Sequence, residues 1–148
     1  MKLSSAMLFL LATKLMAQEP SLPKVSAFFD RIDDGPAFFV ECPNTSGKVL
    51  SSSAIAWGNS LRLDGAIVPN DLNMGPGLTT DVQPGQLWHG IIALRQSQRP
   101  FFPSPKFGAL VRSARVVPLK EGKHTLAVQC LGVWSDDFVF YWETETHP

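Results

Sequence analysis

The segment Pro118–Cys130 constrains the fold more than any other part of the chain. Gly122 lies in a turn, and a regular alternation follows it, in which His124, Leu126, Val128 and Cys130 alternate with Thr125, Ala127 and Gln129. Strict alternation after a glycine turn is typical of a strand that has one face in a hydrophobic core. The segment therefore predicts a half-buried β-strand near the end of the chain.

Other short apolar segments, separated by glycine and proline turns, are predicted strands: 25–29, 37–42, 60–63, 66–68, 87–94, 107–117 and 138–142. The pair Asp64-Gly65 between two of them predicts a tight hairpin, because glycine adopts the positive φ that such turns need. No helical period of useful length follows the first residues. Short strands at regular spacing predict an all-β domain with two layers.

The N-terminus has the features of an export signal. Met1-Lys2 is followed by an apolar run at 6–12 and by the small residue Ala17, the order of a secretory signal peptide. The run is shorter than the roughly 20 residues that span a bilayer. We expect residues 1–17 to be removed and 18–148 to form one secreted or periplasmic domain without stable membrane insertion. Asn44-Thr45-Ser46 is an N-glycosylation sequon, which matters only in a eukaryotic source.

The charge balance gives no reason to expect nucleic acid as a partner. The chain has 13 basic and 13 acidic residues, and removal of Lys2 and Lys14 with the signal leaves 11 basic residues and a slight negative net charge. The segment from Arg95 to Lys123 is nevertheless rich in basic residues, with Glu121 as its only acidic residue. This segment forms either a basic face or several solvated strand edges.

Cys42 and Cys130 are the only cysteines. An isolated pair in an exported chain favours a disulfide over two free thiols. A metal site and a nucleophile are the alternatives, but neither cysteine has a neighbouring cysteine or histidine at zinc spacing.

Three features together resemble immunoglobulin-like sandwiches. Cys42 and Cys130 fall on early and late predicted strands, Trp57 follows Cys42 by 15 positions, and a turn at 119–122 precedes the strand with the second cysteine. The resemblance implies an antiparallel β-sandwich of about 7–9 strands, whose disulfide joins the two sheets and packs against Trp57 on a core strand. Val128 occupies the position of the tyrosine found two residues before the second cysteine in antibody-type domains.

Candidate catalytic groups are few. The histidines are His89, His124 and His147, and no Gly-x-Ser-x-Gly motif occurs. The adjacent carboxylates at 33–34 and 136–137 would face opposite ways on a strand, so neither pair forms a proton-sharing dyad by itself. We interpret both as turn residues, with calcium binding as an alternative, and predict a non-enzymatic protein without a cofactor. A small exported hydrolase or a metal-dependent enzyme remains the alternative from another class.

Binding is the function class that the aromatic residues favour. Trp134 lies in a loop between the last two predicted strands, and Phe101 and Phe102 lie in a proline-rich loop beside Arg99 and Lys106. Exposed loop aromatics next to positive charge form contact sites for proteins, glycans or membrane surfaces, unless they fold back over the end of the sandwich. We therefore predict a binding or accessory module with an unknown protein or glycan partner. A carbohydrate-binding sandwich that uses Trp134 is the alternative.

Overall fold

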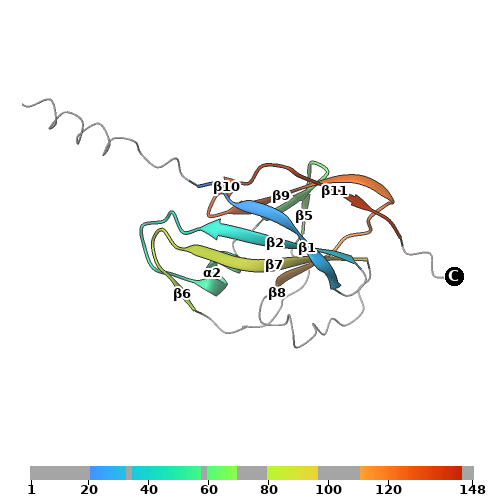
Figure 1. The fold of residues 1–148 in the computed structure, drawn as a ribbon. Coiled ribbons are helices and arrows are strands. Elements are labelled where there is room, and N and C mark those ends of the chain that lie inside the picture. The colour runs from blue at the N-terminus through green and yellow to red at the C-terminus, as the bar shows by residue number, and fades with distance from the viewer. Residues whose placement is uncertain (1–20, 33–34, 58–59, 70–79, 97–110, 145–148) are drawn as a thin grey trace, which may run out of the picture.

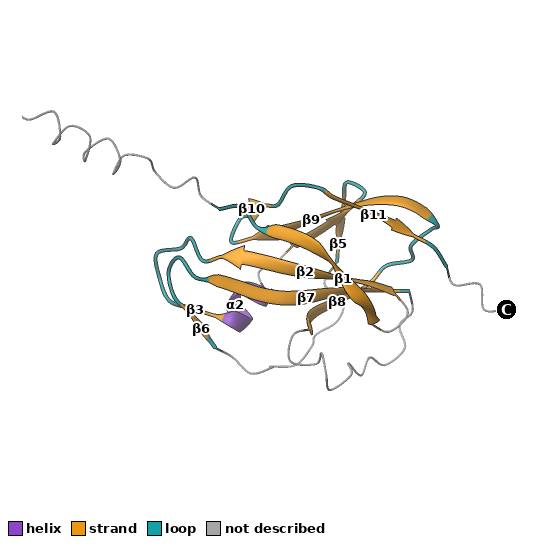
Figure 2. Ribbon diagram, in the orientation of Figure 1, coloured by secondary structure: helices purple, strands orange, loops and turns teal. Residues whose placement is uncertain are grey.

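A computed structural model describes residues 21–32, 35–57, 60–69, 80–96 and 111–144. These residues form two main β-sheets and one short helix (Figures 1 and 2), so the predicted all-β class is confirmed. The proposed signal peptide at 1–17 lies outside the described residues, and its cleavage stays a prediction. Within the described ranges, no helix has the length and hydrophobicity needed to cross a membrane.

The first sheet has four strands in the order β1-β2-β7-β8, with the bounds β1 (Lys24–Ile32), β2 (Gly35–Pro43), β7 (Leu87–Arg95) and β8 (Val111–Val116). β2 and β7 are its two inner strands. The expectation of a purely antiparallel sheet was wrong, because β8 runs parallel to β7. Parallel neighbours need a connection of about a dozen residues or more, and residues 96–110 provide that length.

The second sheet has five strands, in which β9 pairs with β4, β10 and β11: β4 (Ser60–Leu63), β5 (Ala66–Val68), β9 (Gly122–Cys130), β10 (Val133–Trp134) and β11 (Phe138–Trp142). The alternation predicted for β9 is present, with inward residues buried from His124 to Cys130. The predicted hairpin joins β4 to β5, and Asp64 and Gly65 both have positive φ, 49° and 81°.

The segment around Trp57 differs from the expectation. It forms α2 (Ser52–Trp57), a six-residue helix, rather than a core strand. The Ser51 hydroxyl accepts the amide of Ala54 at 3.1 Å, which caps the first turn and favours helix over strand at this point. The Trp57 side chain lies outside the described residues, so its packing on the disulfide stays a prediction.

The two remaining strands, β3 (Leu50–Ser51) and β6 (Asp81–Val82), pair with each other. The described residues contain eleven strands rather than seven to nine, and β3, β6 and β10 are only two residues long.

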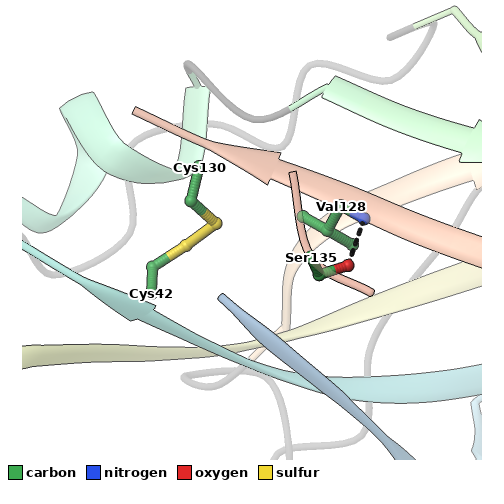
Figure 3. Close-up of a disulfide and its surroundings, with 4 residues drawn as sticks. All are labelled: Cys42, Val128, Cys130 and Ser135. Carbon is green, nitrogen blue, oxygen red and sulfur yellow. Dashed lines mark hydrogen bonds between the residues drawn. A yellow bond between two sulfur atoms is a disulfide. The ribbon is translucent and has the colours of Figure 1, made fainter. Parts of the chain in front are cut away.

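The core lies between the two main sheets and is crossed by a disulfide. Cys42 of β2 and Cys130 of β9 are bonded, with their Cα atoms 5.9 Å apart (Figure 3). The bond therefore joins the four-stranded sheet to the five-stranded one, as the resemblance implies. Buried apolar residues from both sheets surround it, among them Phe38, Val40, Leu61, Trp88, Ile92, Leu126 and Val128.

Candidate interaction site

Four residues of the predicted interaction loop, Arg99, Phe101, Phe102 and Lys106, lie outside the described residues. Their role in binding therefore stays a prediction. The basic segment around them does not form a single exposed face, because Arg95 and Arg115 are only 0% and 2% exposed.

Trp134, the remaining predicted binding residue, is half-buried on β10. The guanidinium of Arg62 lies 4.8 Å from the centre of its ring, in cation–π geometry. Arg62 also binds Asp137, with Nη2 3.1 Å from Oδ1. Arg62 and Asp137 thus belong to the same cluster as Trp134, although sequence reasoning missed Arg62. The sequence did contain a signal for Arg62: it lies between the inward residues Leu61 and Leu63, so strand alternation directs the Arg62 side chain outward.

The outward-facing surface of the five-stranded sheet carries large exposed apolar side chains. Tyr141 is 72% exposed, Ile67 61% and Val139 45%. On neighbouring β9, Lys123 lies opposite Tyr141 and Thr125 lies opposite Val139. We call this surface the outer sheet face and define it by these five residues together with Arg62 and Trp134.

A concave feature, which we call the β1 groove, lies where β1 approaches the β10–β11 connection. It has a volume of about 360 Å³ and is lined by Pro23, Lys24, Val25, Ser26, Glu41, Ser135, Asp136, Asp137 and Phe138. Three of the lining residues are acidic and one is basic. The residues that line the groove therefore carry a net negative charge.

Ser135 fixes one wall of the β1 groove. Its amide donates to the Val128 carbonyl at 2.9 Å, and its hydroxyl accepts the Val128 amide at 3.0 Å (Figure 3). The same hydroxyl donates to the carbonyl of Asp136 at 2.9 Å. Because Ser135 is 93% buried (7% exposed), these bonds are shielded from water and hold the wall in one position.

The two described histidines have different environments. His89 and Glu41 lie 3.7 Å apart on neighbouring strands, with side chains that are 45% and 32% exposed. His124 is 8% exposed, and its ring nitrogens lie 2.7 Å from the Asp64 carboxylate and 2.7 Å from the Lys120 carbonyl. His147 lies outside the described residues.

The contacts of His124 shift two pKa values in opposite directions. The hydrogen bond with Asp64, aided by the bond to the Lys120 carbonyl, raises the pKa of His124. Partial burial acts to raise the pKa of Asp64, but the hydrogen bonds with His124 and the Thr125 amide outweigh it and lower that pKa. Asp64 also accepts the Thr125 amide at 2.9 Å, so the pair joins the β4–β5 turn to the start of β9.

The sequon residue Asn44 is buried, at 1% exposure. Its side-chain amide donates to the carbonyls of Lys48 and Val82, both at 2.8 Å. Its oxygen accepts the amide and the hydroxyl of Ser46, at 3.1 and 2.7 Å. A glycan would need one of these amide hydrogens and access to solvent, so the folded protein leaves no room for one.

Among the described residues, no three histidine, cysteine or acidic side chains gather in a way that would hold a metal ion. No protein-family model, curated protein or solved structure matches the chain.

Proposed function

We propose that the protein is a secreted or periplasmic, non-enzymatic binding module with an immunoglobulin-like fold, and that its ligand is another protein. Strand order supports the fold assignment. The strand orders β1-β2-β7 and β4-β9-β11 match the orders A-B-E and C-F-G of the two immunoglobulin sheets. The disulfide joins β2 to β9, as the immunoglobulin disulfide joins strand B to strand F. A disulfide also agrees with an oxidising compartment outside the cytosol.

The observation that carries the binding function is the 72% exposure of Tyr141 beside other apolar residues. Water contact with large apolar groups is unfavourable, and such groups gather where a partner covers them. Tyrosine, tryptophan and arginine are the residues most enriched at the energetic centres of protein interfaces. The outer sheet face presents all three, as Tyr141, Trp134 and Arg62.

Carbohydrate binding is supported less well by the same residues. The half-buried ring of Trp134 already has Arg62 over it. Trp134 and Tyr141 lie opposite Gln129 and Lys123, six positions apart on β9. At 3.3–3.4 Å per residue, that is about 20 Å, so the two rings do not form one compact stacking platform.

Affinity capture tests the proposal. The purified protein should capture a partner protein from culture supernatant or periplasmic extract. The double variant Val139→Ser, Tyr141→Ser should capture much less of that partner. Leu87→Ser is the matched control, because Leu87 is 46% exposed on the other sheet, and it should capture as well as the wild type. Equal capture by all three proteins would refute the assignment to this face.

A glycan array distinguishes a carbohydrate ligand from a protein ligand. Binding to a polysaccharide that Trp134→Ala abolishes, and that the Val139→Ser, Tyr141→Ser variant retains, would replace a protein partner with a glycan. The present proposal expects no such binding.

A further inference from the structure

β1 is an edge strand of the four-stranded sheet. It is the terminal strand of the order β1-β2-β7-β8, and β2 is its only strand neighbour in the described part of the chain. Residues 24–27 make no backbone hydrogen bonds beyond their pairing with β2, as far as the described residues extend. An edge strand directs alternate amide and carbonyl groups away from its sheet, where they can pair with an added strand.

The β1 groove lies directly beside this edge. One wall is the start of β1, and the other is the Ser135–Phe138 connection of the second sheet. Five consecutive partners hold β1 to β2, from Lys24 opposite Glu41 to Phe28 opposite Ala37. Since Ser135 is fixed to Val128 on the other side, both walls are ordered before a ligand arrives, and little ordering has to accompany binding.

The charges of the groove indicate the character of the ligand. Arg62 binds Asp137 at 3.1 Å, and Lys24 lies opposite Glu41 in the register of β1 and β2, so each of these two carboxylates has a basic residue beside it. Asp136 is exposed, and no cation partners it among the described residues. The groove therefore has one carboxylate available for a positive charge on the ligand.

We propose that the β1 groove binds an extended peptide segment of a partner protein, which adds as a strand to β1 and places a lysine or arginine against Asp136. Main-chain hydrogen bonds to an edge strand provide affinity in this mode, and side-chain contacts provide specificity. Tyr141 and Val139 of the outer sheet face do not line the groove, so the inference goes beyond the proposed function and does not depend on it.

The test uses a synthetic heptapeptide, acetyl-Thr-Val-Thr-Lys-Thr-Val-Thr-amide, titrated into the purified protein and followed by NMR. We expect amide shifts confined to 24–26, Glu41 and 135–138. The same peptide with glutamate in place of lysine should bind about tenfold more weakly, because it meets Asp136 with like charge.

Two further peptides test strand addition itself. Each carries N-methyl groups on alternate amides, one on the odd and one on the even positions. Pairing along β1 uses only one of the two sets, so one methylated peptide should bind like the parent and the other should not bind. Equal binding by both methylated peptides would overturn strand addition.

Variants separate the groove from other surfaces. Asp136→Asn should weaken binding of the lysine peptide about two- to fivefold, the range of an exposed ion pair. Asp81→Asn is the control, because Asp81 is also an exposed aspartate but lies on β6, and this variant should bind the peptide as the wild type does. Tyr141→Ser should also leave peptide binding intact, which distinguishes this site from the outer sheet face. Shifts centred on Val139 and Tyr141, or no saturable binding at millimolar peptide, would refute the proposal.

Discussion

The imidazole of His124 lies between the carboxylate of Asp64 and the carbonyl of Lys120, an arrangement that favours its doubly protonated form. Both ring nitrogens lie 2.7 Å from oxygen atoms, one of Asp64 and one of the Lys120 carbonyl. A neutral imidazole has one N–H group, so one ring nitrogen would direct its lone pair at an oxygen. A doubly protonated ring would donate to both oxygens, and the face of the ring stacks on Phe140 with ring centres 5.4 Å apart.

The Asp64–His124 pair should make stability depend on pH. His124 has a raised pKa, so its contribution is complete below its ordinary value of 6.5 and is lost as pH rises through the higher folded value. Asp64 has a lowered pKa, so its contribution is present above 3.8 and is lost as pH falls through the lower folded value. The pair therefore stabilises the fold most between these two ordinary values.

Asp64→Asn is the matched variant for this prediction. Asparagine keeps an oxygen for the Thr125 amide and tolerates the positive φ of this turn position. We expect it to destabilise the protein at pH 5–6 by about 0.5–1.5 kcal/mol, since Asp64 is half exposed and solvent screens the pair. The difference should shrink above neutral pH in thermal unfolding experiments. A difference that is constant from pH 5 to 9 would contradict the assignment of a charged His124.

The disulfide should contribute a large share of the stability. For a sequence separation of 88 residues, the chain-entropy model gives about 4–5 kcal/mol, although measured bridges often contribute less. The free energy of unfolding of the whole domain is expected to be about 5–15 kcal/mol. Changing both Cys42 and Cys130 to alanine should therefore lower the denaturant midpoint strongly and make the slope steeper, because the unfolded chain without the cross-link is less compact. Thiol titration of the unfolded, unreduced wild type provides the control, and two free thiols would show that the bond does not form.

Asn44 should act as a structural residue and not as a glycan acceptor. Its buried side chain makes hydrogen bonds to Ser46, Lys48 and Val82. Asn44→Ala would leave buried carbonyls without donors, at a cost of about 1–3 kcal/mol or more. Ser53→Ala, outside this network, should have a much smaller effect on the thermal midpoint. In a eukaryotic expression host, folded protein whose mass falls on treatment with a glycosidase would contradict the assignment.

Gly35 should tolerate no side chain. A Cβ atom at this position would lie 1.7 Å from the carbonyl oxygen of Leu94, which is backbone of β7 and cannot rotate away. Gly35→Ala should therefore destabilise the protein by about 3 kcal/mol or more, since β2 and β7 would have to separate locally. Chemical denaturation measures the loss. A loss below about 1 kcal/mol would show that the two strands approach less closely than described.

Local patterns in the sequence predicted much of the fold. Alternation identified β9, and Asp64-Gly65 identified the β4–β5 turn, because both signals depend on neighbouring residues alone. The helix α2 was missed, since six residues are too few for a helical period. Its position also depends on a distant contact, in which the Ser52 amide donates to the Thr80 carbonyl at 2.8 Å. The parallel pairing of β8 with β7 likewise depends on where a long connection returns, which no local pattern records.

The site was less predictable for the same reason. Trp134 was singled out, but its partner Arg62 comes from β4, and Asp137, which binds Arg62, comes from the segment before β11; only strand pairing brings them together. The β1 groove is formed by two segments more than a hundred positions apart. No spacing in the sequence indicates a surface of that kind.

The disulfide also determines how the domain would respond to mechanical force. A pull on both ends is transmitted from the N-terminal segment to Cys42, across the two sulfur atoms to Cys130, and on to the C-terminal segment. The two cysteines are 88 positions apart, and the chain between them would form a closed loop that carries no tension as long as the disulfide stays oxidised. At 3.3–3.6 Å per residue, roughly 300 Å of extension is hidden in that loop. Reduction would release this length, so the redox state would set how far the module can stretch between two anchoring points.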